Sequence, residues 1–130
     1  MQQFKLATFL DPVEGRDEEF NAWYDKQHIP DALSLPGMKS AQRFETGPRF
    51  MGRGAPCRYL VIYTIEALSM EKALEVFTHG TAEFYVSDAA DLSSIHSFPL
   101  TPLGPMYTSS EEARAGEGGV RAQAAGIMGK

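Results

Sequence analysis

The pattern of apolar positions along the chain marks two short segments as buried β-strands. Residues 3–10 carry five apolar side chains with little polar relief, and residues 58–65 are mostly aliphatic or aromatic. Runs of this length, rich in β-branched and aromatic residues, are typical of strands that are buried on both faces. Because side chains alternate along a strand, one face of the second strand carries Tyr59, Val61, Tyr63 and Ile65.

Between these strands, an aromatic stripe predicts a helix that begins near Asp17. Phe20, Tyr24 and His28 recur at intervals of four residues and therefore lie in one line on a helix. Pro30 lacks an amide hydrogen and disfavours helical backbone in the residue before it, so we expect the regular helix to stop or kink near His28. An imidazole at a helix C-terminus lies near exposed carbonyl groups, which favour its charged form close to neutral pH.

The remaining segments complete an alternation of strands and helices. Residues 38–45 follow a proline-glycine turn and predict a strand, and a loop rich in glycine and proline, residues 46–56, joins it to the next strand. Residues 69–79 begin with a capping serine and space apolar side chains at helical intervals, which predicts a second helix. Residues 94–100 predict a last strand, placed at a sheet edge by its prolines.

This order, β-α-β-β-α-β, predicts an α+β fold of the ferredoxin-like type, a four-stranded antiparallel sheet with both helices on one face. The opposite face of the sheet would be uncovered although its central strands are apolar on both faces. We therefore expect a homodimer in which two such faces pack together. The domain is expected to span residues 1–108. Residues 109–130 lack aromatic side chains and are rich in glycine and alanine, which predicts a flexible or partner-docked tail.

Composition narrows the classes of partner. The chain has 130 residues, a formal net charge of -5 and a pI near 5.1. An acidic protein is a poor match for nucleic acid or for an anionic membrane surface, so neither is expected as a partner. The single cysteine, Cys57, cannot form an internal disulfide. No apolar run is long enough to span a membrane, and a cytoplasmic location is expected.

A group of side chains on and around the first helix has the chemistry of a small-molecule pocket. His28 is the candidate acid-base residue, because an imidazole that titrates near neutral pH can transfer protons. Tyr24 and Tyr63 are candidate hydroxyl donors or aromatic walls. Arg43 is the candidate anchor for a substrate carboxylate or enolate, since its guanidinium can hold such a group in two hydrogen bonds.

Three further residues are candidate substrate contacts, namely Trp23, Asp31 and His96. Each candidate also has a purely structural interpretation. Trp23 can serve in core or dimer packing, Arg43 in a surface ion pair, and Asp31 as a cap after the helix break. With three separated histidines and one cysteine, the sequence predicts no metal site, and it contains neither a phosphate-binding loop nor a His-Glu-x-x-His motif.

Several short motifs together resemble the EthD-like branch of the dimeric α+β barrel superfamily. They are Asp11-Pro12, Glu19-Phe20, Trp23-Tyr24-Asp25, His28-Ile29-Pro30-Asp31, Leu35-Pro36-Gly37 and Arg43-Phe44, followed by the strand around Tyr59 to Tyr63. The similarity covers about residues 3–107. It implies subunits that pair sheet to sheet into a barrel, each with a pocket between helices and sheet. Relatives include cofactor-free monooxygenases, polyketide cyclases, muconolactone-type isomerases and heme-binding enzymes, so the fold alone selects no reaction.

The candidate residues favour an enzyme that transfers protons on an anionic, conjugated metabolite without metal or nucleotide. The expected reactions are cis-trans or double-bond isomerisation of a ring-cleavage product of aromatic-compound catabolism, or cyclisation or lyase chemistry. Two other functions stay open. One is cofactor-independent monooxygenation of a phenolic substrate, and the other is non-catalytic binding or an accessory role in a degradation pathway. Within the superfamily, heme ligation through His28 or His96 is a further option.

Overall fold

The computed structural model of the protein describes residues 1–110. Its strands are β1 (Gln2–Pro12), β2 (Met38–Glu45), β3 (Tyr59–Ala67) and β4 (Ala90–Leu100). Its helical segments are α1 (Asp17–Trp23), η1 (Tyr24–His28), α2 (Ile29–Leu33) and α3 (Met70–Gly80). The tail predicted for residues 109–130 lies, from residue 111 onward, outside the described part of the chain.

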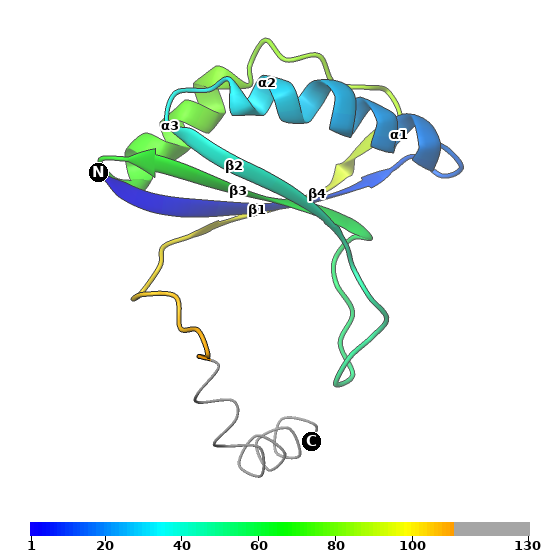
Figure 1. The fold of residues 1–130 in the computed structure, drawn as a ribbon. Coiled ribbons are helices and arrows are strands. Elements are labelled where there is room, and N and C mark those ends of the chain that lie inside the picture. Colours follow the sequence, from blue (N-terminus) through cyan, green and yellow to red (C-terminus); the bar gives the residue numbers. More distant parts are fainter. Residues whose placement is uncertain (111–130) are drawn as a thin grey trace.

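The four strands form one antiparallel sheet in the order β2-β3-β1-β4. All helices lie over one face of this sheet, whereas the β2–β3 loop and the segment after β4 extend from the opposite side (Figure 1). The expected α+β class and four-stranded antiparallel sheet are therefore confirmed. The arrangement is compatible with the ferredoxin-like fold.

The strand register explains why β1 and β3 are apolar on both faces. Phe4 pairs with Ile65, and Leu6 pairs with Tyr63, so these side chains share the face that the helices cover. The residues between them face the other way and form the uncovered face. It includes the apolar residues Ala7, Phe9, Phe44, Leu60, Ile62, Phe98 and Leu100 and the polar residues Lys5, Ser40, Gln42, Thr64 and His96.

The chain stays helical past His28, so the helix does not stop there, but its regular α-helical geometry is interrupted just before this residue, as the kink alternative predicted. His28 and Ile29 both keep helical backbone angles, and the helix continues through Pro30 to Leu33. The segment Tyr24–His28 widens into a π-helical turn, in which the amide of Ile29 donates to the carbonyl of Tyr24, five residues back. The π-turn lies just before Pro30, whose missing amide hydrogen also interrupts the α-helical ladder of hydrogen bonds.

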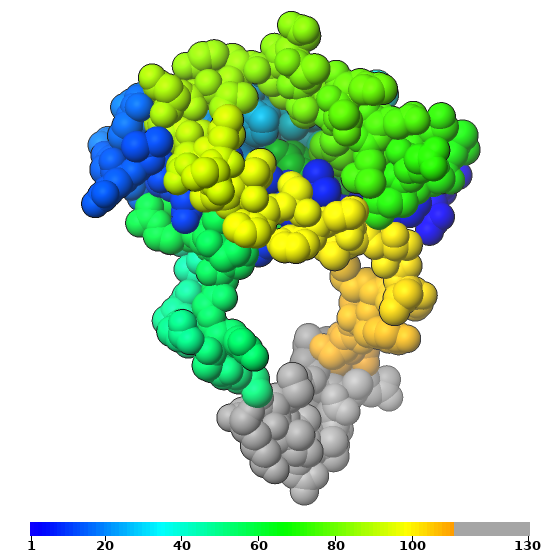
Figure 2. Space-filling model, turned by 180° about the vertical axis from the view of Figure 1, so that it is seen from behind, coloured from blue at the N-terminus to red at the C-terminus, as the bar shows by residue number. Residues whose placement is uncertain are grey.

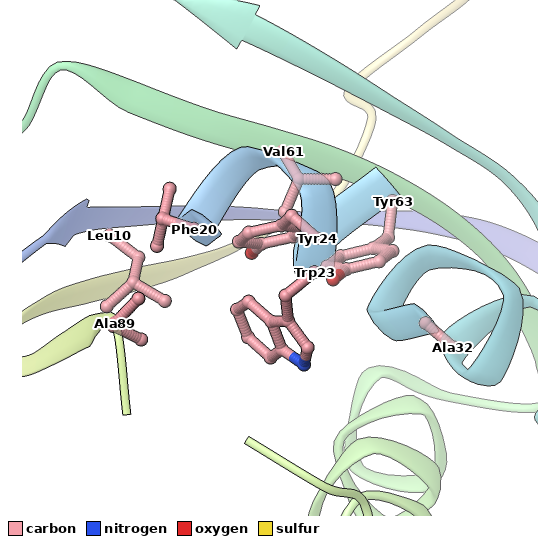
Figure 3. Packing of buried hydrophobic residues seen from close by; sticks show 9 residues of the cluster. Leu10, Phe20, Trp23, Tyr24, Ala32, Val61, Tyr63 and Ala89 are labelled. Carbon is pink, nitrogen blue, oxygen red and sulfur yellow. The ribbon is translucent and has the colours of Figure 1, made fainter. Parts of the chain in front are cut away.

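The main core lies where α1 and η1 pack on the helix-facing side of the sheet (Figure 3). Phe20 and Val61 are fully buried there, and Phe20 makes ring contacts with Trp23, Tyr24 and Tyr59 at centroid distances of 5.5–6.1 Å. A smaller cluster beneath α3 contains Phe4, Ile65, Ala67 and Ala73. Phe20 is therefore the most deeply buried of the aromatic side chains that pack the first helix against the sheet.

Truncation of Phe20 is expected to lower the stability of the domain strongly. Phe20→Ala removes a fully buried ring and leaves a cavity, which should decrease the free energy of unfolding by about 3–5 kcal/mol. Urea unfolding followed by circular dichroism measures the change. The control is Leu68→Ala, at a leucine that is 75% exposed, where a change within about 0.5 kcal/mol is expected. Equal effects of the two substitutions would contradict this description of the core.

Candidate functional site

A cavity of about 490 Å³ lies between the helices and the sheet. Its volume is in the range of sites that hold small organic molecules. The lining residues are Leu6, Thr8, Leu10, Trp23, Tyr24, His28, Tyr63, Leu74, Phe77, Thr78, Thr81, Phe84, Val86, Leu92, Ile95, Ser97 and Pro99. Most of these side chains are apolar or aromatic, and among the described residues no lysine, arginine, aspartate or glutamate lines the cavity.

The cavity opens at the edge of the sheet. Seen from behind, a hollow separates the green residues of α3 from the yellow residues of β4 (Figure 2). Leu92 and Ile95 of β4 and Val86 of the preceding loop line the cavity and are partly exposed. A ligand can therefore enter between β4 and α3, past an apolar rim.

His28 lies within a set of aromatic rings at the cavity wall. Its ring centroid is 4.9 Å from that of Trp23, 5.0 Å from that of Tyr24 and 6.0 Å from that of Phe84. Neither ring nitrogen has a hydrogen-bond partner within residues 1–110, and Nδ1 is buried. Because Nε2 is not buried and His28 lines the cavity, Nε2 is the nitrogen available to a ligand.

The charge state of His28 differs from the one expected for a helix terminus. Burial lowers the pKa of His28 below its ordinary value of 6.5, the positive charge of Arg43 lowers it further, and Asp31 opposes both effects. The expectation of a stabilised imidazolium was wrong, since the residue lies inside a continuous helix and in an apolar environment. At neutral pH, His28 is a neutral imidazole that can accept a proton.

Tyr24 and Tyr63 bring two buried hydroxyl groups to the same site (Figure 3). Burial raises the pKa of Tyr24 to about 12, and the hydrogen bond with Tyr63 and the charge of Arg43 only partly offset this effect. Burial also raises the pKa of Tyr63, and its interaction with Tyr24 raises it further. Both phenols are therefore protonated at neutral pH and act as hydrogen-bond donors rather than as bases.

Trp23 combines a structural contact with a position at the cavity. Its indole Nε1 donates a hydrogen bond of 3.2 Å to the carbonyl of Tyr85, in the loop between α3 and β4. Its ring packs against Phe20 and Tyr24 and also lines the cavity. Core packing and ligand contact are thus two functions of one side chain.

Arg43 lies behind the cavity wall rather than in it. Its guanidinium stands 4.4 Å from the ring centroid of Tyr24, pairs with Asp25 at 3.0 Å and donates to Asn21 at 2.7 Å. It does not line the cavity, so the structure gives no support to its predicted contact with a substrate carboxylate. Instead, the cation packs on the tyrosine face, a favourable arrangement, and influences the site through its charge.

Two other predicted contacts also lie elsewhere. Asp31 does not line the cavity, and it acts on His28 only through its charge, which favours the imidazolium. His96 pairs with Phe9 on the uncovered face of the sheet, and its Nδ1 lies 2.8 Å from the carbonyl of Ser94. Of the predicted residues, the structure therefore brings together Trp23, Tyr24, His28 and Tyr63 at the cavity.

Sequence reasoning missed the opposite side of the cavity. Thr8 and Ser97 line it from the sheet, and Phe77 and Phe84 line it from α3 and the loop that follows. The alternation of side chains along β4 could have identified Ser97, because Ser97 and His96 are adjacent and therefore lie on opposite faces of the sheet. The contribution of the loop at residues 81–89 had no comparable signal, since its backbone follows no simple period.

Neither comparison with known proteins nor a search for metal-binding side chains identifies the class of this protein, so the fold and the cavity are the basis for assigning it. No model of a known protein family matches the chain, and no curated protein matches it significantly. Within the described residues, no three metal-ligating side chains come together, and no helix is long and apolar enough to cross a membrane. Fold and site together define a small α+β protein with an apolar, histidine-bearing ligand cavity.

The lowered pKa of His28 predicts a pH-dependent stability. Between the pKa of the folded state and 6.5, the unfolded state binds more protons, so the free energy of unfolding decreases as the pH falls through this window. The decrease from about pH 7.5 to about pH 5.5 should be larger for the wild type than for His28→Gln. Urea titrations of both proteins measure it. An equal decrease, or a larger one in the variant, would show that burial does not suppress the charge of His28.

Proposed function

We propose that the protein is an enzyme that transfers a proton within an apolar, conjugated or aromatic-derived metabolite, using His28 as general base and requiring no metal or nucleotide. The observation that carries this proposal is the neutral His28, which has no hydrogen-bond partner among residues 1–110, at the wall of an apolar cavity beside the phenol groups of Tyr24 and Tyr63. A base that operates at neutral pH needs a pKa near or below that pH and a substrate within reach.

The chemistry follows from the three polar side chains. The lone pair of His28 Nε2 accepts a proton from carbon next to a substrate carbonyl, and the electrons of the broken C–H bond move to the carbonyl oxygen. The hydroxyl of Tyr24 or Tyr63 donates a hydrogen bond to the resulting enolate oxygen. Where a C=C bond adjoins that carbon, the enolate is conjugated with it, and the imidazolium returns the proton to the far carbon of this bond, which moves the double bond into conjugation with the carbonyl. This sequence is an isomerisation, and it also begins a cyclisation or an elimination.

The expected substrate is uncharged at the reacting end. A carboxylate in this cavity would find no cation on its wall, because Arg43 is engaged by Asp25, Asn21 and the face of Tyr24. Burial of an unpaired carboxylate is strongly unfavourable. We therefore replace the anionic metabolite expected from the sequence with a neutral ketone or phenol, for which aromatic walls are the natural environment.

Hydrogen exchange on 2-tetralone, a neutral bicyclic ketone, tests the proposal without knowledge of the natural substrate. Wild-type protein in deuterated buffer should accelerate deuterium incorporation beside the carbonyl, as followed by NMR. Loss of a positioned base should reduce this acceleration by about a hundredfold or more in His28→Gln. The rate should rise with pH through a pKa below 6.5 and level off near neutrality, since only the neutral imidazole is active.

The control is His79→Gln, at an exposed histidine of α3 that does not line the cavity, and it should exchange like the wild type. Wild-type protein that binds 2-tetralone without exchange would indicate the binding or accessory function instead. Exchange that survives in His28→Gln would contradict the role of His28. Product formation that depends on dissolved oxygen would favour the monooxygenase alternative, in which the same base generates an anion that reacts with oxygen.

We also propose that two copies pair through the uncovered face of the sheet. Phe98 and Phe44 on this face are 47% and 40% exposed, and Phe98 packs edge-on against Phe9. The β2–β3 loop and the segment after β4 extend from the same side (Figure 1), and they carry the exposed residues Phe50, Met51, Leu103, Met106 and Tyr107. An apolar face flanked by apolar arms is the kind of surface that a second copy covers.

Phe98→Lys tests the pairing, because a charge at the centre of the interface would be buried without a partner. The wild type should have the mass of a dimer by light scattering, and the variant that of a monomer. Glu71→Lys, on the exposed side of α3, introduces a lysine and an even larger change in charge away from the interface, and it should remain dimeric. A monomeric wild type, or a dimeric Phe98→Lys, would refute this mode of pairing.

A further inference from the structure

The hydroxyl groups of Thr8 and Ser97 form a polar pair on the sheet side of the cavity, whose other lining residues there are apolar apart from Tyr63. Thr8 of β1 is directly opposite Ser97 of β4, and their oxygens are 2.7 Å apart. Both residues line the cavity. Thr8 is only 8% exposed, whereas Ser97 is on the edge strand and exposed, so the pair lies on the side of the cavity toward its mouth.

The pair has hydrogen-bonding capacity to spare. Each hydroxyl carries one hydrogen and can accept bonds as well, and their mutual hydrogen bond uses only one of the two hydrogens. Neither side chain makes another hydrogen bond to the described residues. By contrast, the hydroxyl of Thr81 is engaged by the carbonyl of Phe77 at 2.7 Å, and the indole of Trp23 is engaged by Tyr85. Thr8 and Ser97 can therefore donate to a ligand and accept from it.

The sheet register separates this pair from the reacting end of the cavity. Thr8 pairs with Val61, and Tyr63 is two residues further along β3 on the same face. Such diagonal neighbours lie roughly 7–8 Å apart in an antiparallel sheet. Ser97 is one strand further away from Tyr63. A single ligand that touches Tyr63 and the pair therefore needs polar groups at two distant points of its skeleton.

We propose that Thr8 and Ser97 are specificity-determining residues that bind a second oxygen substituent of the substrate. The substrate class is then a fused-ring ketone or phenol with one oxygen at His28, Tyr24 and Tyr63 and another at its far edge. This inference rests on the proposed function in treating the cavity as the substrate site. A hydroxyl that finds this pair regains the hydrogen bonds it loses on leaving water, whereas the same hydroxyl against aliphatic side chains would not.

The test compares two probes that differ only in the distant oxygen, 2-tetralone and 6-hydroxy-2-tetralone. Isothermal titration calorimetry gives the Kd of each for the full chain. Wild-type protein should bind the hydroxylated probe about three- to tenfold more tightly, the effect of one net hydrogen bond. In the double variant Thr8→Val/Ser97→Ala, this preference should disappear or invert. If the double variant fails to fold, Ser97→Ala alone, on the exposed edge strand, should still reduce the preference.

The matched control is Thr78→Val, which removes a hydroxyl from the α3 side of the same cavity and should leave the preference intact. Equal affinity of the wild type for both probes would overturn the inference. It would also be overturned if the preference survived without the Thr8 and Ser97 hydroxyls, or disappeared in Thr78→Val. His28→Gln should keep the preference while losing deuterium exchange, so the failure of the catalytic proposal and that of this inference are separately visible.

Discussion

The site depends on the packing of one aromatic helix surface against the sheet through a π-helical turn. In a regular α-helix, residues five apart point in directions that differ by roughly 140°, so Trp23 and His28 would not meet. The wider turn at Tyr24–His28 brings their rings to 4.9 Å while Tyr24 remains in contact with both. With Phe20 fully buried against the sheet, this turn places the imidazole at the cavity wall. The proline that follows is thus accommodated by the same distortion that forms the site.

The charge states of the cavity residues follow from the absence of Lys, Arg, Asp and Glu side chains among the described residues that line the cavity. In the part of the chain that the structure describes, every charged side chain lies outside the lining, including Arg43, whose cation packs behind Tyr24. An imidazole in such surroundings loses the solvation that stabilises its charged form, and phenols lose the solvation of the phenolate. The result is a neutral acceptor next to two neutral donors, a combination suited to enolisation of an uncharged substrate.

Much of the fold was predictable because it follows from local periodicity. The apolar runs at β1 and β3 and the spacing of Phe20, Tyr24 and His28 correctly indicated two central strands and the inward stripe of the helix. The continuation through Pro30 was not predictable from backbone preferences, since proline disfavours helical backbone at and before its own position, whereas His28 and Ile29 keep helical angles here.

The site was only half predictable for a related reason. Residues on the helix stripe were identified by their spacing. The position of the Arg43 side chain, in contrast, depends on which tertiary partners it meets, and it meets Asp25 and the ring of Tyr24 rather than the cavity. His96 was wrongly expected at the cavity. Which face of the sheet each residue of an edge strand occupies depends on the strand register, and the register of β4 with β1 includes a bulge between Phe9 and Asp11. The family resemblance seen in the sequence motifs remains a prediction, and the proposed reaction rests on the chemistry of His28.

The most direct test of the central claim is an NMR titration of the histidine side chains, with the signal of His28 assigned by its absence in His28→Gln. We predict that the ring of His28 titrates at a pKa below 6.5 and stays neutral at physiological pH. A pKa at or above 6.5 would contradict the account, because the residue would then be solvated or paired with a carboxylate rather than buried as a neutral base.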